Sequence, residues 1–243
     1  MKMDEIIDVN PTPQSEKTTI CILGQKGVGK TYAMAILGDQ LQCRTLYLDL
    51  IGAFTETQLV RNAIYLRINS TDREKTIQAL ETGFKKSKRI VLDMRNLVPR
   101  EKVYMVDIVS QWVMHYGNVA VFLDEVAFVC PQSSRMYSDE FHRLVMAGRN
   151  FNCVPVCFST QRSQTAHKDI LALADRYLIF RLIHNLDRNK VKDLIGLKEK
   201  EWEVMENEIM TLQRKEAYLF YVAKGERVLK KVIMPEWNVK EGA

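Results

Sequence analysis

A glycine-rich segment from Gly24 to Thr31, GQKGVGKT, carries the residue types that bind phosphate groups. Its spacing fits G-x-x-x-x-G-K-[ST] at every fixed position, between an apolar run and the amphipathic segment TYAMAILGDQLQ. A loop that surrounds phosphates needs inward-pointing backbone N–H groups, and glycine adopts the required conformations at low cost. A helix that starts at this loop adds its dipole and its free N–H groups. These features predict a polyphosphate site.

The side chains of this segment have distinct roles in binding a nucleoside triphosphate. Lys30 would reach the β- and γ-phosphates, and the hydroxyl of Thr31 would ligate Mg²⁺. The alternative, a glycine turn that matches by accident, does not explain why the flanking segments are also correct. The expected nucleotide-binding set is Gly24, Gln25, Lys26, Gly27, Val28, Gly29, Lys30, Thr31 and Tyr32.

Two adjacent acids follow another apolar run, in VAVFLDE. Asp124 would hold the magnesium ion through water, and Glu125 would polarise an attacking water as a general base. A glutamate in this place favours hydrolysis of ATP over transfer of phosphate to a small molecule. Asp93, in RIVLDM, is a competing metal ligand, but no glutamate follows it. A solvated strand end is the alternative interpretation of the pair.

A third polar group lies in VCFSTQR, where Gln161 follows the apolar run 154–160. Ligands bind at the carboxyl edge of an open parallel sheet, so this residue is expected beside the other two motifs. A glutamine there can hydrogen-bond the γ-phosphate or the lytic water, and so sense whether the phosphate bond is intact. The alternative is a polar loop start.

Short apolar runs with few polar alternations predict the strands. They are rich in Val, Ile, Leu, Phe and Tyr, which is typical of strands covered on both faces in a largely parallel sheet. The expected strands are residues 18–24, 44–50, 89–94, 119–125, 154–160 and 176–182.

Amphipathic segments between these runs predict helices. The segment from Pro99 has Val106, Val109 and Val113 on one face, and a helix over 138–148 would have Ser138 as its N-cap. Near the C-terminus, two short helices are expected on either side of Gly196. Alternation of strands and helices indicates a three-layer α/β P-loop fold with a largely parallel central sheet.

The end of the chain predicts a small antiparallel strand pair. AYLFYVA and KVIMP read as strands, and KGER between them reads as a hairpin turn. We expect one P-loop domain over residues 17–235. Residues 1–16 are expected to be a mobile leader or docking arm, and residues 236–243 a tail.

The length, charge and cysteine content of the chain limit the classes of protein to which it can belong. The chain has 243 residues and a net charge of +5, from 35 basic and 30 acidic residues, which does not by itself imply a nucleic-acid partner. No signal peptide or transmembrane segment is expected, which predicts a cytoplasmic protein. Five cysteines without metal-binding spacing suggest reduced thiols, of which Cys21, Cys130, Cys153 and Cys157 have apolar neighbours.

The order of these motifs resembles the FtsK–HerA superfamily of DNA-translocating P-loop ATPases. The chain is most similar to the genome-packaging ATPases of membrane-containing icosahedral viruses, including archaeal ones. The resemblance covers roughly residues 17–235 and rests on GQKGVGKT, VFLDE, MAGRN, VCFSTQR and ILALADRYLIFRL. The combination is more specific than the P-loop alone.

This resemblance implies a ring, usually a hexamer, with ATP between subunits and double-stranded DNA in the pore. By position, Asp124, Glu125 and Gln161 are implied to be catalytic, and Arg149 matches an arginine donated to the neighbouring subunit. The competing arginines are Arg135, Arg143 and Arg162. Larger members carry additional domains, so this chain is expected to depend on a capsid or membrane-vertex protein.

Two basic clusters are candidates for sequence-independent contacts with DNA phosphates. One is Lys85, Lys86, Lys88 and Arg89; the other is Arg162, His167 and Lys168. A solvated face is the alternative for each. Two other functions stay open: a cellular or plasmid HerA-like translocase, and a nucleotide-gated assembly ATPase that moves no DNA. A small-molecule kinase conflicts with Glu125.

Overall fold

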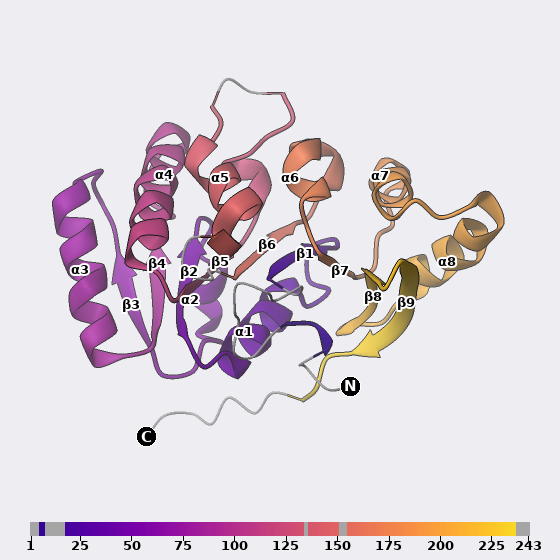
Figure 1. Cartoon of the computed structure of the whole chain (residues 1–243), viewed down its shortest axis with the longest axis horizontal. Helices are drawn as coiled ribbons and strands as arrows, with labels where there is room; N and C mark the ends of the chain where they lie inside the picture. Colours follow the sequence, from indigo (N-terminus) through magenta and orange to yellow (C-terminus); the bar gives the residue numbers. More distant parts are fainter. Residues whose placement is uncertain (1–4, 8–17, 134–135, 151–154, 237–243) are drawn as a thin grey trace.

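A computed structural model describes residues 5–7, 18–133, 136–150 and 155–236 (Figure 1). Within these ranges one sheet has the strand order β3-β4-β2-β5-β6-β1-β7-β8-β9. The pairings from β3 to β7 are parallel, while β7–β8 and β8–β9 are antiparallel. The strands are β1 (Thr19–Leu23), β2 (Arg44–Asp49), β3 (Ala63–Arg67), β4 (Arg89–Asp93), β5 (Val119–Leu123), β6 (Val156–Thr160), β7 (Arg176–Ile179), β8 (Glu216–Ala223) and β9 (Glu226–Ile233).

Helices cover both faces of this sheet (Figure 1). On one face, α3 to α8 pack over one apolar cluster; on the other, α1 and α2 cover a second cluster. The helices are α1 (Lys30–Gln40), α2 (Ala53–Thr57), α3 (Arg73–Lys86), α4 (Pro99–Tyr116), α5 (Asp139–Ala147), α6 (Lys168–Ala172), α7 (Asn185–Ile195) and α8 (Glu199–Thr211). The predicted α/β class and largely parallel sheet are confirmed.

The uninterrupted apolar runs follow from this two-sided cover. In β5, Val121 and Leu123 belong to the cluster under α3 to α8, while Ala120 and Phe122 belong to the one under α1 and α2. Successive side chains of a strand point to opposite faces, so a strand covered on both sides needs apolar residues at every position.

Several predicted boundaries are confirmed. Helix α4 begins at Pro99, and the Ser138 hydroxyl accepts a hydrogen bond from the N–H of Phe141 (3.3 Å) at the start of α5. Helix α7 stops at Gly196, whose φ of 61° is in the left-handed region. A residue in this conformation ends an α-helix, and glycine adopts it at the lowest cost.

Other elements were missed or misplaced in the sequence analysis. Strand β3 and helix α3 were not predicted. Strand β3 is a half-buried edge strand, and the inner face of α3 includes Thr76 and Gly83, which weaken its apolar periodicity. Strand β9 runs from Glu226 to Ile233, so it begins before KVIMP (231–235) and ends two residues before that segment does. The turn is confined to residues 224–225.

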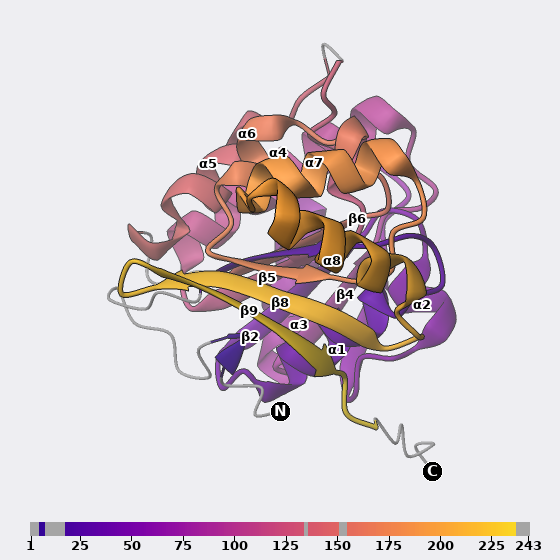
Figure 2. The same ribbon diagram turned by 90° about the vertical axis from the view of Figure 1, so that its right-hand side faces the viewer.

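The C-terminal strand pair continues the main sheet beside the phosphate loop. Strand β8 pairs with β7, and the N–H of Lys215 donates to the carbonyl of Val28 (3.0 Å). Figure 2 shows α7 and α8 lying over β8 and β9. This element therefore supports one side of the loop that begins at Gly24.

The two ends of the chain are described only in part. Of the expected arm 1–16, residues 5–7 are described, and Ile6 and Ile7 are buried in the cluster under α1 and α2. The rest of the arm and residues 237–243 lie outside the described residues. No helix in the described part of the chain is long and apolar enough to span a membrane.

Candidate nucleotide site

Three consecutive strands, β5, β6 and β1, bring the three sequence motifs to one edge of the sheet. The parallel register aligns Leu23 of β1 with Thr160 of β6, and Leu123 of β5 with Phe158 of β6. The glycine-rich loop, the acid pair and Gln161 each follow one of these neighbouring strands. Because the carboxyl ends of parallel strands lie at the same edge of a sheet, the three motifs lie close together. Strand β6 lies in the middle, so its end faces both other motifs.

The glycine-rich loop has the backbone that its composition predicts. Gly27 and Gly29 have φ values of 81° and 114°, in the left-handed region, and Gly29 is the N-cap of α1. Gly24 has a different reason to be glycine, because a Cβ there would lie 2.6 Å from the Cβ of Phe180. The loop turns tightly against β7 and opens the N-terminus of α1 toward the sheet edge.

Lys30 is the first residue of α1 and is buried, with 6% of its surface exposed. Its ammonium group donates to the carbonyl of Gln25 (3.1 Å), so the side chain folds back over the loop. Burial lowers the pKa of Lys30, and the nearby carboxylates of Asp124 and Glu125 oppose that shift. A buried cation between a phosphate loop and two acids is placed to bind phosphate oxygens.

Asp124 and Thr31 lie in direct contact. The Thr31 hydroxyl donates to Asp124 Oδ2 (3.3 Å), and the Ser159 hydroxyl donates to Oδ1. Mg²⁺ prefers oxygen ligands and keeps several waters and substrate phosphates, so this hydroxyl–carboxylate pair fits the ion. Among the described residues, no group of three or more His, Cys, Asp or Glu side chains is arranged so that it could hold a metal ion.

Glu125 has a backbone conformation that is rare for its residue type. Its φ of 63° and ψ of 72° lie in the left-handed region, which costs a non-glycine residue about 1–2 kcal/mol. The carboxylate accepts a hydrogen bond from the Thr160 hydroxyl (2.7 Å) and another from the N–H of Gln161 (2.9 Å). Strain of this kind persists where surrounding contacts hold it, and it is concentrated at functional sites.

The electrostatics of Glu125 suit a proton acceptor. Burial raises its pKa, the Thr160 and Gln161 hydrogen bonds oppose the rise, Asp124 adds to it and Lys30 opposes it. A carboxylate in such surroundings is more basic than one in water, which is the property that a general base needs.

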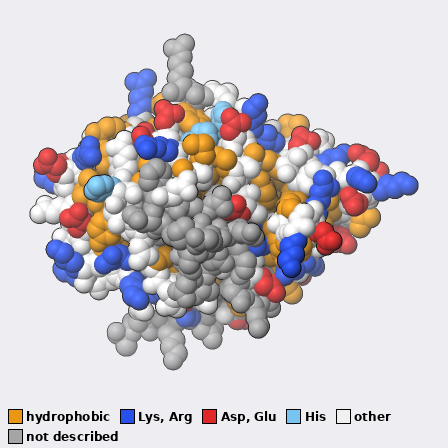
Figure 3. All heavy atoms as spheres, in the orientation of Figure 1, with side chains coloured by type: hydrophobic (Ala, Val, Ile, Leu, Met, Phe, Trp, Pro, Cys, Tyr) orange, Lys and Arg blue, Asp and Glu red, His pale blue; other side chains and the backbone are white. Residues whose placement is uncertain are grey.

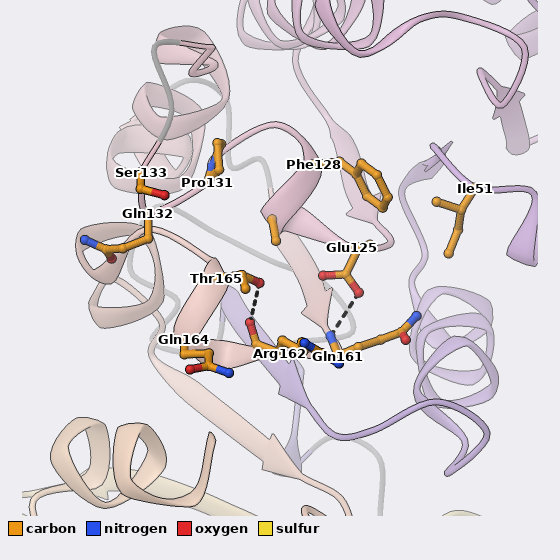
Figure 4. Close-up of a pocket in the computed structure, with 11 residues that line it drawn as sticks. Ile51, Glu125, Phe128, Pro131, Gln132, Ser133, Gln161, Arg162, Gln164 and Thr165 are labelled. Atoms are coloured by element: carbon orange, nitrogen blue, oxygen red, sulfur yellow. Dashed lines mark hydrogen bonds between the residues drawn. The ribbon is translucent and has the colours of Figure 1, made fainter. Parts of the chain in front are cut away.

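Gln161 and Glu125 line a pocket of about 550 Å³ (Figure 4). Its walls come from the ends of β5 and β6, the turn η2 (Val126–Phe128), the turn η4 (Ser163–Thr165) and residues 131–133. Figure 4 shows the Glu125 carboxylate bonded to the backbone nitrogen of Gln161. The amide side chain of Gln161 is thus left for another partner beside the acid.

The remaining residues of the nucleotide-binding set frame the loop. Lys26 and Gly27 are exposed, and Val28 is buried. The Tyr32 hydroxyl donates to the carbonyl of Pro235 (2.8 Å), and the Lys215 ammonium lies 4.5 Å from the centre of the Tyr32 ring.

The competing acid Asp93 is placed elsewhere by the strand order. Strand β4 lies two strands beyond β5, away from β1. The Asp93 carboxylate is nearly fully buried and accepts hydrogen bonds from Arg67 (3.1 Å) and Arg95 (3.2 Å). Asp93 therefore organises two arginines at the end of the sheet and does not lie beside the phosphate loop.

The candidate arginines are described unequally. Arg149 belongs to the turn η3 (Gly148–Asn150), but its side chain lies outside the described residues, as does Arg135. Arg143 forms an ion pair with Glu140 (3.6 Å), and the exposed Arg162 lines the pocket beside Glu125.

The basic residues of the two candidate DNA-binding clusters lie on different elements of the fold. Lys85 and Lys86 end α3, whereas Arg89 begins β4 and forms an ion pair with Asp39 (2.9 Å). Lys168 begins α6. Cys21, Cys43, Cys130 and Cys157 are buried free thiols, and Cys153 lies outside the described residues.

Sequence reasoning missed Arg181, which follows β7. Its carbonyl accepts a hydrogen bond from the N–H of Gln25 (3.1 Å), and its guanidinium donates to the Gln25 amide oxygen (3.0 Å) when the amide is oriented to pair with it. The polar ending of the run RYLIFRL was the available signal. Arg181 holds the start of the phosphate loop from the side opposite β6.

Comparison with solved structures identifies proteins of the same fold. B204, the genome-packaging NTPase of Sulfolobus turreted icosahedral virus 2, was solved in complex with AMPPCP; the TM-score is 0.60 at 12% identity, covering 90% of this chain and 100% of that chain. B204 of Sulfolobus turreted icosahedral virus, a DNA-packaging ATPase, gives 0.61 at 13% identity, covering 88% and 97%. The predicted resemblance to viral packaging ATPases is confirmed for the fold.

A further neighbour is VirB4 of Thermoanaerobacter pseudethanolicus, with a TM-score of 0.64 at 12% identity, covering 91% of each chain. No protein-family model matches the chain, and no curated protein matches it. At these identities the likeness establishes the three-layer P-loop architecture, and residue roles come from the site itself.

Proposed function

We propose that this protein hydrolyses ATP with Mg²⁺. The observation that carries the proposal is the convergence of Lys30, Thr31, Asp124 and Glu125 at one sheet edge, with contacts that link the phosphate loop to the acids. The solved complexes of B204 with AMPPCP and ATP-gammaS support nucleotide as the ligand of this fold.

Each residue has a step that its position supports. Loop N–H groups and Lys30 bind the phosphates, and Thr31 with Asp124 would hold Mg²⁺, which neutralises charge on the β- and γ-phosphates. Glu125 would accept the proton of the attacking water as the bond from the water oxygen to the γ-phosphorus forms and the bond from the γ-phosphorus to the β,γ-bridging oxygen breaks, which releases ADP and phosphate. The Gln161 amide is the candidate sensor that orients this water or the γ-phosphate.

We further propose that hydrolysis moves double-stranded DNA, as in packaging of a viral genome into a preformed capsid. The motif order and the fold likeness to B204 support this function. It requires a homo-oligomeric ring, taken to be a hexamer, with Arg149 reaching the neighbouring site. It also requires a capsid or membrane-vertex partner and places the protein in the host cytoplasm.

The charge distribution constrains how DNA would be held. On the face seen in Figure 3, basic and acidic side chains are interspersed. With a net charge of only +5, the grip on DNA must come from a few basic residues repeated around the ring. Such contacts with phosphates would be sequence-independent and sensitive to salt.

A HerA-like cellular or plasmid translocase is the second candidate, and the TM-score of 0.64 with VirB4 supports it as well as the B204 likeness supports packaging. Both motors predict the same primary response to DNA. An assembly ATPase that moves no DNA predicts nucleotide-dependent oligomerisation without that response.

The test of the proposed function is the steady-state ATPase rate with and without duplex DNA. We expect Mg²⁺-dependent hydrolysis that increases on addition of duplexes of unrelated sequence and declines as salt rises. Lys30→Ala protein is the background control, because it removes the cation at the phosphates. An ATPase rate that does not change on addition of DNA would exclude a DNA-translocating motor and leave the assembly ATPase as the function. Absence of ATP hydrolysis would exclude both functions.

A further inference from the structure

The end of β6 carries two buried hydroxyls in succession, Ser159 and Thr160. Strand β6 lies between the acid-bearing strand β5 and the phosphate-loop strand β1. The Ser159 hydroxyl donates to Asp124, and the Thr160 hydroxyl donates to Glu125 (2.7 Å). Each of the two acids therefore has its own hydroxyl donor on the neighbouring strand.

This one-to-one pairing follows the alternation of side chains along the two neighbouring strands. Successive side chains of a strand point to opposite faces, so Ser159 and Thr160 diverge and each meets a different acid. Glu125 follows Asp124 just after the end of β5 and has a left-handed backbone, with a φ of 63°. The contacts from Thr160 and Gln161 offset the conformational cost and hold the carboxylate in one orientation.

The surroundings of Thr160 direct its proton to the acid. Its hydroxyl oxygen accepts a hydrogen bond from the N–H of Arg162 (3.3 Å). Its single proton has two acceptors in reach, the Glu125 carboxylate at 2.7 Å and the Arg162 carbonyl at 3.3 Å. The shorter bond to a charged acceptor is the stronger one. The branched Cβ of threonine also restricts χ1, so the donor is preorganised.

We propose that Thr160 is the positioning residue of the general base Glu125, fixing the carboxylate at the wall of the pocket beside Gln161. This inference rests on the proposed ATP hydrolysis and extends it to a residue that contacts the general base. Thr160 acts through Glu125, while the backbone N–H of Gln161 fixes the other carboxylate oxygen.

The test is a comparison of Thr160→Val with Thr160→Ser. Valine keeps the branched shape and removes the hydroxyl, whereas serine keeps the hydroxyl. We expect Thr160→Val to bind a fluorescent ATP analogue with unchanged affinity, keep KM, and lose about 10- to 100-fold in kcat, because small misplacements of a reacting group have effects of this size. Thr160→Ser is expected to restore most of kcat.

Thr45→Val is the matched control. It removes another fully buried threonine hydroxyl from the same sheet, near the start of β2 and level with Ala120 of β5, at the end of the strand away from the acids. We expect its kcat to stay near that of the wild type. If Thr160→Val fails to fold, the pair Thr160→Ala and Thr160→Ser compares absence and presence of the hydroxyl without the bulk of valine.

A double-mutant cycle separates positioning from an independent role. In a Glu125→Gln background, Thr160→Val is expected to cause no further loss of residual activity. Full additivity of the two losses, or a Thr160→Val enzyme with wild-type kcat, would overturn the inference and leave the ATPase intact. A wild-type protein that does not hydrolyse ATP would overturn the proposed function and this inference together.

Discussion

Glu125 combines three properties at the scale of a single residue: a strained backbone, near-complete burial and two hydrogen bonds to its carboxylate. Each of these properties alone is also found at residues that have no catalytic role. Together with Lys30 and Asp124 in its electrostatic environment, they favour a proton-transfer role over a solvated strand end.

Glu125→Gln therefore should separate binding from turnover. The amide keeps the size of the side chain but cannot accept the proton of water, so kcat is expected to fall by about 10²–10⁴-fold while ATP affinity is retained. Equilibrium binding and steady-state hydrolysis measure the two. Hydrolysis by Glu125→Gln at the native rate would assign the general base to another residue.

Lys30→Ala should have the complementary effect. Removing the buried cation is expected to weaken binding of the triphosphate by at least about 100-fold, because charge-assisted contacts to phosphate are lost. The control is Lys200→Ala, which removes an exposed lysine on α8, outside the nucleotide-binding set, and should change affinity little. Calorimetric titration with a non-hydrolysable analogue checks both; equal losses would mean that Lys30 has no special role.

At the scale of elements, helix α5 shows how capping and tertiary contacts cooperate. The Ser138 hydroxyl caps the helix and donates to the Asp107 carboxylate of α4 (2.6 Å), which also accepts from the N–H of Glu140 (3.1 Å). The cap thus connects α5 to α4. Helix α5 leads into the turn that carries Arg149, so its stability bears on the proposed arginine.

Ser138→Ala should destabilise the protein by about 1–2 kcal/mol, because a buried cap is lost and the Asp107 carboxylate loses a donor. Ser70→Ala, at an exposed loop position, is the control and should have little effect. Urea unfolding measures the free energy of both variants. A loss at Ser138 no larger than at Ser70 would show that the N–H groups find other acceptors.

At the scale of the whole molecule, the sheet edge of one chain supplies phosphate-binding and acidic groups, and the proposed ring adds an arginine from a neighbour. Lys30→Ala and Arg149→Ala are each expected to be inactive alone. If Arg149 acts on a neighbouring site, random mixtures contain interfaces in which one partner supplies Lys30 and the other Arg149.

About a quarter of the interfaces in an equal mixture would then be intact, and activity should return to that order. The measurement is ATPase rate against mixing ratio after subunit exchange. Mixtures that stay inactive would count against a shared site, and Arg162→Ala and Arg143→Ala in the same format would test the competing arginines.

By itself, the sequence determined the phosphate loop, the acid pair and the parallel class of the sheet. These signals are local: a loop motif has fixed spacing, and a strand covered on both faces must be apolar throughout. Strand β3 and helix α3 were not predicted, because a half-buried edge strand and a helix whose inner face includes Thr76 and Gly83 have a weak hydrophobic periodicity.

The sequence favoured Asp124 over Asp93 through the glutamate that follows Asp124, but only the tertiary structure gave the strand order, which places β5 and not β4 next to β6. It also decided the partners of the site. Thr160 meets Glu125 and Arg181 meets Gln25 across long separations in the chain, and such hydrogen bonds have no local signature. They arise when parallel strands align their carboxyl ends at one edge.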